Sequence, residues 1–245
     1  WRYRIRSRIH SCSRRHLHRY GLHRSCSFHR PFLYRRRRCR FCDYHLDYSK
    51  DEAANFALNS TQLQKVTGKY HCLEVINSGS FVDLDEQTLS LIEHICLEKD
   101  ITQVHFECHW MHRKAVADFR KRFADKGITL KIKIGVETFD FKFREEVLDK
   151  GITTKDPAKI AQYFDEACLL FGLTGQTTAS MKRDVETALT YFQRVCINIM
   201  TPNGSSLQPD DTVISLFARE LYPLYAENPR IDILMENTDF GIGGN

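Results

Sequence analysis

Apolar positions from residue 51 onward follow two periods, one typical of helices and one typical of strands. Residues 85–99 carry apolar side chains at helical spacing, which are Leu89, Ile92, Ile95 and Cys96. Residues 130–136 alternate between apolar and other side chains, which is typical of a strand. The two patterns succeed one another along the chain, so we expect helices and strands in alternation.

The same patterns predict helices over residues 51–66, 85–99, 114–126, 143–149, 157–164, 179–192 and 210–224. They predict strands over residues 72–76, 103–110, 130–136, 167–173, 195–200 and 231–235, with a possible short strand at 31–34. Alternation with short loops favours a parallel sheet, because parallel neighbours need a crossover of this length. About six strand–helix units are fewer than the eight of a complete barrel. The predicted fold class is α/β, an open, partial (β/α)6 TIM-like barrel.

The first residues differ from the rest in both pattern and charge. Residues 1–40 contain 14 of the 22 arginines and no Lys, Asp or Glu, so the net charge of +5 leaves −9 on residues 41–245. Two interpretations are open: a basic arm that neutralises nucleic-acid phosphates, or sequence from a misread frame that is not native. We therefore predict an irregular Arg/His-rich segment over 1–38 and one α/β domain over 39–245.

Two features bear on where the protein acts. No run of about 18 uncharged apolar residues occurs, so we expect a soluble protein with no membrane partner. The 9 cysteines lack the spacing of a small secreted framework, which favours a reducing cytoplasm. Five of them are expected to be buried apolar residues, namely Cys72, Cys96, Cys108, Cys168 and Cys196.

The closely spaced pair Cys39 and Cys42 carries a different chemistry. Two thiolates in this arrangement can face one soft metal, either zinc or an iron–sulfur cluster. Taken alone, the spacing is also compatible with a redox pair, with half of a zinc site and with chance. Phe41 precedes the second cysteine, and this aromatic residue reduces the number of site types that the cysteine pair can represent.

With that aromatic residue, the motif resembles the cluster loop of the radical S-adenosylmethionine (SAM) superfamily, CxxxCx(aromatic)C. Cys39, Phe41 and Cys42 match its second half, whereas the first cysteine of the family falls at Arg35. The resemblance implies a 4Fe–4S cluster bound by Cys39 and Cys42. Because a guanidinium stays protonated and cannot replace a thiolate, we expect the chain as written to bind a cluster poorly.

The resemblance extends over about residues 39–240, and three further segments resemble those that bind SAM in the family. The turn after the second strand contains Ser78, Gly79 and Ser80 and resembles the segment that binds the amino group of SAM. The end of the fourth strand contains Glu137 and resembles the segment that binds the ribose. The stretch after the fifth strand contains Gly172, Thr174 and Gly175 and resembles the segment that contacts the adenine. Glycine lets a backbone approach a ligand closely, but ordinary βα loops use glycine as well.

Polar residues alternate along the strand predicted over 103–110. His105, Glu107 and His109 share one face, and Glu107 and His109 lie nearest its carboxyl end. These two side chains are candidates to contact or deprotonate a substrate. Two alternatives remain open: interior polar residues, with Lys133 paired to Glu107 or Glu137, and a zinc site that lacks a third ligand.

Taken together, the resemblance implies an enzyme that uses a 4Fe–4S cluster to cleave SAM to a 5′-deoxyadenosyl radical acting on a small substrate. It also implies a flavodoxin- or ferredoxin-type electron donor. The turn at Gly79, the residues 105–112 and the end at 237–241 resemble small members, some of them lyases, linked to salvage of 7-deazapurines. The alternative function is a non-catalytic barrel without a cluster that binds a partner or nucleic acid through its Arg-rich arm.

Overall fold

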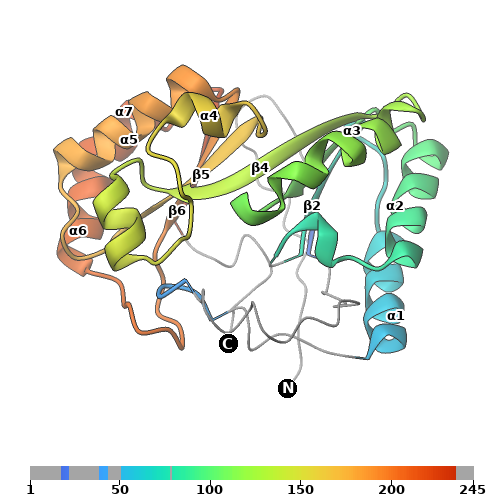
Figure 1. Ribbon diagram of the computed structural model, residues 1–245, viewed down its shortest axis with the longest axis horizontal. Helices are drawn as coiled ribbons and strands as arrows, with labels where there is room; N and C mark the ends of the chain where they lie inside the picture. The colour runs from blue at the N-terminus through green and yellow to red at the C-terminus, as the bar shows by residue number, and fades with distance from the viewer. Residues whose placement is uncertain (1–17, 22–38, 44–50, 78, 236–245) are drawn as a thin grey trace. The chain divides into compact units, whose positions relative to one another are not determined.

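The computed structural model describes residues 18–21, 39–43, 51–77 and 79–235 (Figure 1). These residues divide into two compact units. The first unit contains residues 18–21, 51–77 and 79–133, and the second contains residues 39–43 and 134–235. No helix in these ranges is long and apolar enough to cross a bilayer.

The strands form one sheet, and every strand pair whose register is described is parallel. They are β1 (His18–Gly21), β2 (Cys72–Ile76), β3 (Gln103–Glu107), β4 (Thr129–Glu137), β5 (Glu166–Phe171), β6 (Arg194–Ile199) and β7 (Ile231–Leu234), and their order in the sheet follows the chain. The parallel pairs are β1–β2, β2–β3, β3–β4, β5–β6 and β6–β7. This confirms the predicted parallel sheet. Strand β1 lies within the segment that we expected to be irregular.

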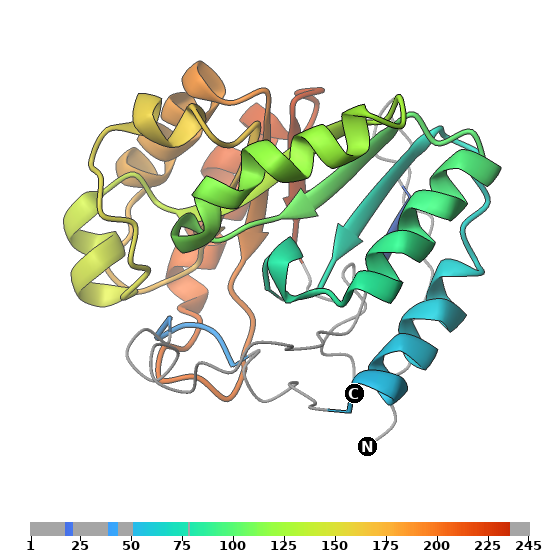
Figure 2. The same cartoon turned by 45° about the vertical axis from the view of Figure 1, so that its right-hand side comes forward.

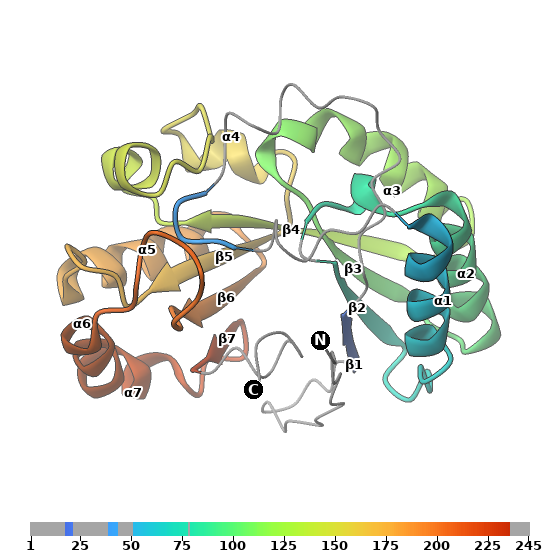
Figure 3. The same cartoon turned by 90° about the horizontal axis from the view of Figure 1, so that it is seen from below.

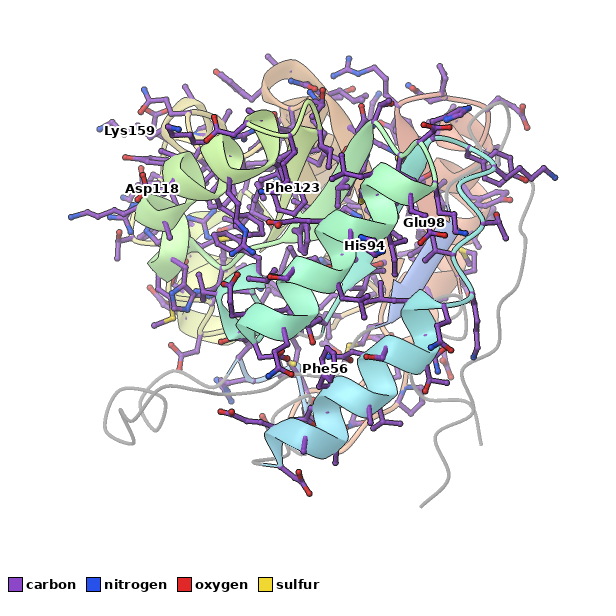
Figure 4. All side chains as sticks on the ribbon, turned by 90° about the vertical axis from the view of Figure 1, so that its right-hand side faces the viewer. Phe56, His94, Glu98, Asp118, Phe123 and Lys159 are labelled. Atoms are coloured by element: carbon purple, nitrogen blue, oxygen red, sulfur yellow. The ribbon has the colours of Figure 1, made fainter. Side chains whose placement is uncertain are left out.

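In the first unit, helices pack on one face of the strands. The helices are α1 (Glu52–Leu63), α2 (Glu86–Glu98) and α3 (Val116–Ala124), and α2 and α3 lie over β2 and β3 (Figure 2). Phe81 stacks on Phe119 of α3 at 3.9 Å between ring centroids, and Phe106 of β3 meets Phe119 edge-on at 5.0 Å. Phe123 is fully buried in the same aromatic core, whereas His94 and Glu98 lie on the outer face of α2 (Figure 4).

Strand β3 is shorter than expected. We predicted a strand to residue 110, but β3 ends at Glu107 and a 3₁₀ turn begins at Trp110. The reason is that the backbone N–H of His109 donates to the Ser80 hydroxyl at 2.9 Å, while its Nδ1 accepts from the N–H of Met111 at 3.3 Å. His109 therefore caps a turn, and the prediction that it continues the strand face of Glu107 is wrong.

In the second unit, one long helical run and α5 cover the strands. The helices are α4 (Pro157–Ala161), α5 (Thr178–Tyr191), α6 (Asp211–Leu216) and α7 (Tyr222–Tyr225), with π-helical turns at Phe143–Val147 and Phe217–Leu221. The core joins β5 and β6 to α5, to α6 and to the π-helical turn that follows α6. Its buried side chains include Leu169, Phe171, Met181, Ile197, Val213 and Phe217. Figure 3 shows α5, α6 and α7 along the same side of β5, β6 and β7. The predicted helix over 210–224 corresponds to the run from α6 to α7.

In the first unit, the face of the sheet that α2 and α3 do not cover carries buried charged groups. Glu74 and Lys133 are 2% and 5% exposed, and the Lys133 ammonium donates to Oε1 of Glu74. Register places His105 beside Glu74 and Glu107 beside Lys133. The expected alternative partner Glu137 is paired elsewhere, with Lys150. Four of the five cysteines expected to be buried are buried, and Cys72 is partly exposed.

Candidate functional site

The two cysteines of the Cys39–Cys42 segment lie in one tight turn of the second unit. The backbone N–H of Cys42 donates to the carbonyl of Cys39 at 3.2 Å, and both thiols are partly exposed. Hydrogen bonds from distant segments fix this turn: Arg40 N to Leu148 O at 3.0 Å, Leu207 N to Arg40 O at 3.1 Å, Asn203 Nδ2 to Phe41 O at 3.0 Å, and Gly204 N to Asp43 Oδ2 at 2.7 Å. The turn is therefore held by the rest of its unit.

Phe41 anchors the same turn through apolar packing. Its ring packs against a small cluster formed by Leu148, Leu170, Leu173 and Met200. Leu170 belongs to the end of β5, while Leu173 and Met200 directly follow β5 and β6. The structure thus places the cysteine turn beside the carboxyl ends of these strands, which is where ligands bind in parallel α/β folds.

The donor set at this turn is incomplete for a 4Fe–4S cluster. Such a cluster requires thiolate ligands, and the motif that this turn resembles, CxxxCx(aromatic)C, supplies three. The described residues supply Cys39 and Cys42, and they contain no group of three or more His, Cys, Asp or Glu suited to a metal ion. The sequence resemblance predicts the third cysteine at the position of Arg35, which lies outside the described residues. The residues present therefore do not fit a complete cluster site.

A buried ion pair lies beside the cysteine turn. Glu137 ends β4, and its Oε1 accepts a hydrogen bond from Nζ of Lys150 at 2.6 Å. The two residues are 6% and 9% exposed, and the Lys150 ammonium lies 5.3 Å from the centroid of the Phe41 ring. Burial favours the neutral amine, but the Glu137 carboxylate and the Cys39 thiol outweigh it and raise the pKa of Lys150. Burial also raises the pKa of the Cys39 thiol, which Lys150 partly opposes.

Gly135 makes room for this ion pair. A Cβ atom added there would lie 2.5 Å from Oε1 of Glu137 and 2.9 Å from Nζ of Lys150. Real Cβ atoms do not approach other atoms so closely, so any side chain would displace the pair. Sequence analysis selected Glu137 and missed Lys150, because nothing in its local pattern separates it from an exposed loop lysine.

The stretch predicted to contact adenine forms an ordered turn after β5. Gly172 and Gly175 both have φ of +95°, which favours glycine. The N–H of Asp210 donates to the carbonyl of Gly172 at 2.8 Å, and the Thr174 hydroxyl donates to Oδ2 of Asp210 at 2.9 Å. A Cβ at Gly172 would lie 2.7 Å from Ile214 of α6. These contacts give the residues a structural role, and their contact with adenine stays a prediction.

In the first unit, the turn after β2 meets the end of β3. Ser80 is buried, its N–H donates to Oδ2 of Asp83 at 2.8 Å, and its hydroxyl accepts from His109 N at 2.9 Å. Two predicted site residues, Ser80 and His109, are thereby brought together. Gly79 is partly exposed in the same turn, and Ser78 lies outside the described residues.

One acceptor at this turn has no hydrogen-bond partner among the described residues. Asn77 follows β2 and is fully buried; its Nδ2 donates to the carbonyl of Ser80 at 2.9 Å, whereas its Oδ1 is buried and no described residue donates to it. Buried polar atoms are rarely left in this state, so a ligand that offers an N–H group fits the site. Sequence analysis did not select Asn77, although it directly precedes the glycine-containing turn.

Glu107 and His109 are both partly exposed, but they come from different local structures. Glu107 is the last residue of β3, on the face that also carries His105, and His109 caps the following 3₁₀ turn. The carboxyl end of a parallel strand is a suitable place for substrate contact. Their contact with a substrate stays a prediction.

Asp184 of α5 supports the chain that follows Glu137. It is 4% exposed, and its Oδ1 accepts from the N–H of Phe139 at 2.7 Å. Burial raises the pKa of Asp184 to about 6, while hydrogen bonds from Thr138 and Phe139 oppose the increase. Sequence analysis did not select this residue, since a lone Asp on a helix carries no distinctive pattern.

The chain was compared with family models, curated protein sequences and solved structures. No family model and no curated protein sequence matches the chain. Among solved structures, the chain is similar to the queuine lyase from Clostridium spiroforme bound to SAM and queuine, with 33% sequence identity and a TM-score of 0.86. The similarity covers 98% of this chain and 100% of that chain. This likeness confirms the predicted fold class, a partial α/β barrel of the type seen in that structure.

Proposed function

Since this chain belongs to the radical SAM superfamily, we propose that it is a lyase that uses SAM to cleave queuine, a 7-deazapurine base. The observation that carries this proposal is the full-length similarity to a queuine lyase whose structure contains SAM and queuine. The similarity has 33% identity and covers 98% of this chain and 100% of that chain, so it is not confined to one part of the fold.

The candidate residues take distinct roles in this proposal. Gly79 and Ser80 bind the amino group of SAM, Glu137 binds its ribose, and the turn from Gly172 to Gly175 packs on its adenine. The buried, unpartnered Oδ1 of Asn77 beside the first of these turns supports an amino-group ligand there. Positive φ values at Gly172 and Gly175 support close backbone approach at the third.

Glu107 and His109 are proposed to contact queuine. They belong to other segments than the three assigned to SAM, and a carboxylate and an imidazole can bind or deprotonate a polar base. The reducing cytoplasm is the proposed location, and a flavodoxin- or ferredoxin-type protein is the proposed electron donor.

The 4Fe–4S cluster requires one thiolate more than the described residues supply. Cys12 and Cys26 precede the motif in the sequence, but neither has the spacing of the family. The same deficit favours the second candidate function, a non-catalytic protein that binds a partner or nucleic acid through its Arg-rich arm. Iron content after anaerobic reconstitution separates the two, because a non-catalytic binder holds no cluster, whereas an enzyme that lacks one of its thiolates still holds some iron and gains more when the cysteine is restored.

The decisive experiment restores the missing cysteine. The original chain and Arg35→Cys are reconstituted anaerobically with iron and sulfide and assayed with dithionite as the electron donor. Arg36→Cys serves as a control that adds a cysteine at the wrong spacing. We expect Arg35→Cys to hold about four irons per chain, to cleave SAM to 5′-deoxyadenosine and to consume queuine. The original chain and the control should hold less iron and should consume queuine more slowly than Arg35→Cys.

Each contrary result rejects a different part of the proposal. If Arg35→Cys holds no more iron than Arg36→Cys, the assignment of position 35 is wrong. If it holds the cluster and cleaves SAM but leaves queuine unchanged, the substrate is wrong. Tight binding of nucleic acid by the original chain, lost when residues 1–38 are removed, would favour the non-catalytic function.

A further inference from the structure

We propose that Lys150 positions Glu137 for SAM, by holding one carboxylate oxygen so that the other accepts hydrogen bonds from the ribose hydroxyls. This inference rests on the proposed function, in which Glu137 binds the ribose. Lys150 is a positioning residue in this view, because it acts through Glu137. The evidence is the way the surrounding chain fixes both partners.

The backbone on both sides of Lys150 is held by hydrogen bonds. The N–H of Lys150 donates to the carbonyl of Arg144 at 3.2 Å. On the other side, Glu145 accepts hydrogen bonds from Gly151 N at 2.7 Å and from Ile152 N at 3.1 Å. A loop lysine with a merely structural surface role does not need such support.

Arg144 links this loop to the end of β4. Its side chain is fully buried and donates to the carbonyls of Thr138 at 3.3 Å, Ile152 at 3.4 Å and Thr154 at 2.6 Å. Thr138 directly follows Glu137, so one guanidinium fixes the backbone beside Glu137 and beside Lys150 at the same time. The relative position of the two partners is therefore set by the fold.

The backbone of Glu137 itself has an uncommon conformation. Its φ is +68°, a value that non-glycine residues seldom adopt and that clusters at ligand sites. Lys150 likewise lies between Asp149 with φ of +50° and Gly151 with φ of +77°. These conformations and the small residue at Gly135 serve one arrangement, the ion pair between Glu137 and Lys150.

The ion pair leaves the carboxylate with capacity for a ligand. Among the described residues, Lys150 is the single hydrogen-bond donor to Glu137, and it occupies Oε1. An ionised carboxylate has two oxygens that can each accept hydrogen bonds, so Oε2 is able to accept from a diol. Lys150 also keeps the buried carboxylate paired, because an uncompensated charge at this place would be strongly unfavourable.

The test separates action through Glu137 from direct contact with SAM. The variants are Lys150→Met, Glu137→Gln and the double variant, with Lys159→Met as the control, since Lys159 is exposed on α4 (Figure 4). Calorimetry in the Arg35→Cys background measures the Kd of SAM and of 5′-methylthioadenosine, which has the ribose and adenine but lacks the carboxylate. A charge-neutral double variant should fold even where Lys150→Met leaves Glu137 unpaired.

We expect Lys150→Met to weaken both ligands by the same factor, about tenfold, and the double variant to be no weaker than Glu137→Gln. Lys150→Arg should recover most of the affinity, and Lys159→Met should change nothing. If Lys150→Met unfolds, the inference is tested instead by comparing the ligand affinities of Lys150→Arg and of the double variant with those of Glu137→Gln.

Three results would overturn the inference. Weakened SAM with unchanged 5′-methylthioadenosine would mean that Lys150 contacts the carboxylate of SAM directly. Additive losses in the double variant would mean that the two residues act separately, and unchanged affinities would mean a structural role. Absence of SAM binding by the Arg35→Cys parent and by the control would instead reject the proposed function, and this inference with it.

Discussion

Replacing Asp184 by Asn should change how the stability of the protein depends on pH. Asp184 is buried at 4% exposure, and burial raises the pKa of its carboxyl from 3.8 to about 6. In the unfolded chain the carboxyl titrates near its ordinary value. Between these two values the folded protein binds more protons than the unfolded chain, so its free energy of unfolding falls as the pH rises.

The size of the effect follows from the difference of roughly two pH units. Each unit corresponds to about 1.4 kcal/mol, so the ionised carboxyl lowers the free energy of unfolding by roughly 3 kcal/mol above pH 6. Below the ordinary pKa the carboxyl is neutral in both states and this penalty is absent. Asp184→Asn keeps an acceptor for the N–H of Phe139 and removes the titration.

Urea unfolding followed by circular dichroism at pH 4 and pH 7 measures this difference. We expect Asp184→Asn to match the original chain at pH 4 and to exceed its stability at pH 7. Asp118→Asn is the control, because Asp118 is exposed on α3 (Figure 4). Equal pH dependence in Asp184→Asn and the original chain would refute the reasoning, and so would a variant that is less stable at pH 7.

Three further predictions concern the other candidate positions. In the Arg35→Cys background, Glu107→Gln should slow queuine turnover while sparing uncoupled SAM cleavage; loss of SAM binding, measured by calorimetry, would place Glu107 in the cofactor site instead. Lys133→Met leaves the carboxylate of Glu74 buried without this partner, so it should lower the free energy of unfolding in urea by about 3–5 kcal/mol. Adding Glu74→Gln should restore most of this loss, and equal stability of the single and double variants would argue against the ion pair. Gly172→Ala combines a φ of +95° with a contact of 2.7 Å to Ile214 and should cost about 1–3 kcal/mol, a prediction that an unchanged unfolding midpoint would contradict.

Local patterns were sufficient where an element is determined by its own residues. The helix predicted over 85–99 is observed as α2 (Glu86–Glu98), because its apolar stripe is local and Asp85 caps its first turn through the N–H of Thr88. The strand predicted over 130–136 is likewise observed as β4. In both cases the burial pattern repeats with the period of the element itself.

Local patterns failed where the determining partner is distant in the sequence. Strand β3 ends early because Ser80, 29 residues before His109, captures its backbone N–H. Lys150 is buried because Glu137, 13 residues earlier, accepts from its ammonium. Neither hydrogen bond changes the periodicity of the residues around it. These contacts are therefore visible only in the folded structure.

The contacts that fix the cysteine turn have a consequence for protein synthesis. Cys39 and Cys42 are synthesised before two of the groups that hold their turn, because Asn203 and Gly204 lie 162 and 161 residues after their partners Phe41 and Asp43. A nascent chain that ends before Asn203 therefore lacks these two contacts to the cysteine turn. During that interval oxidation or stray metals compete for the thiols, and their capture in the native turn is among the last steps of folding.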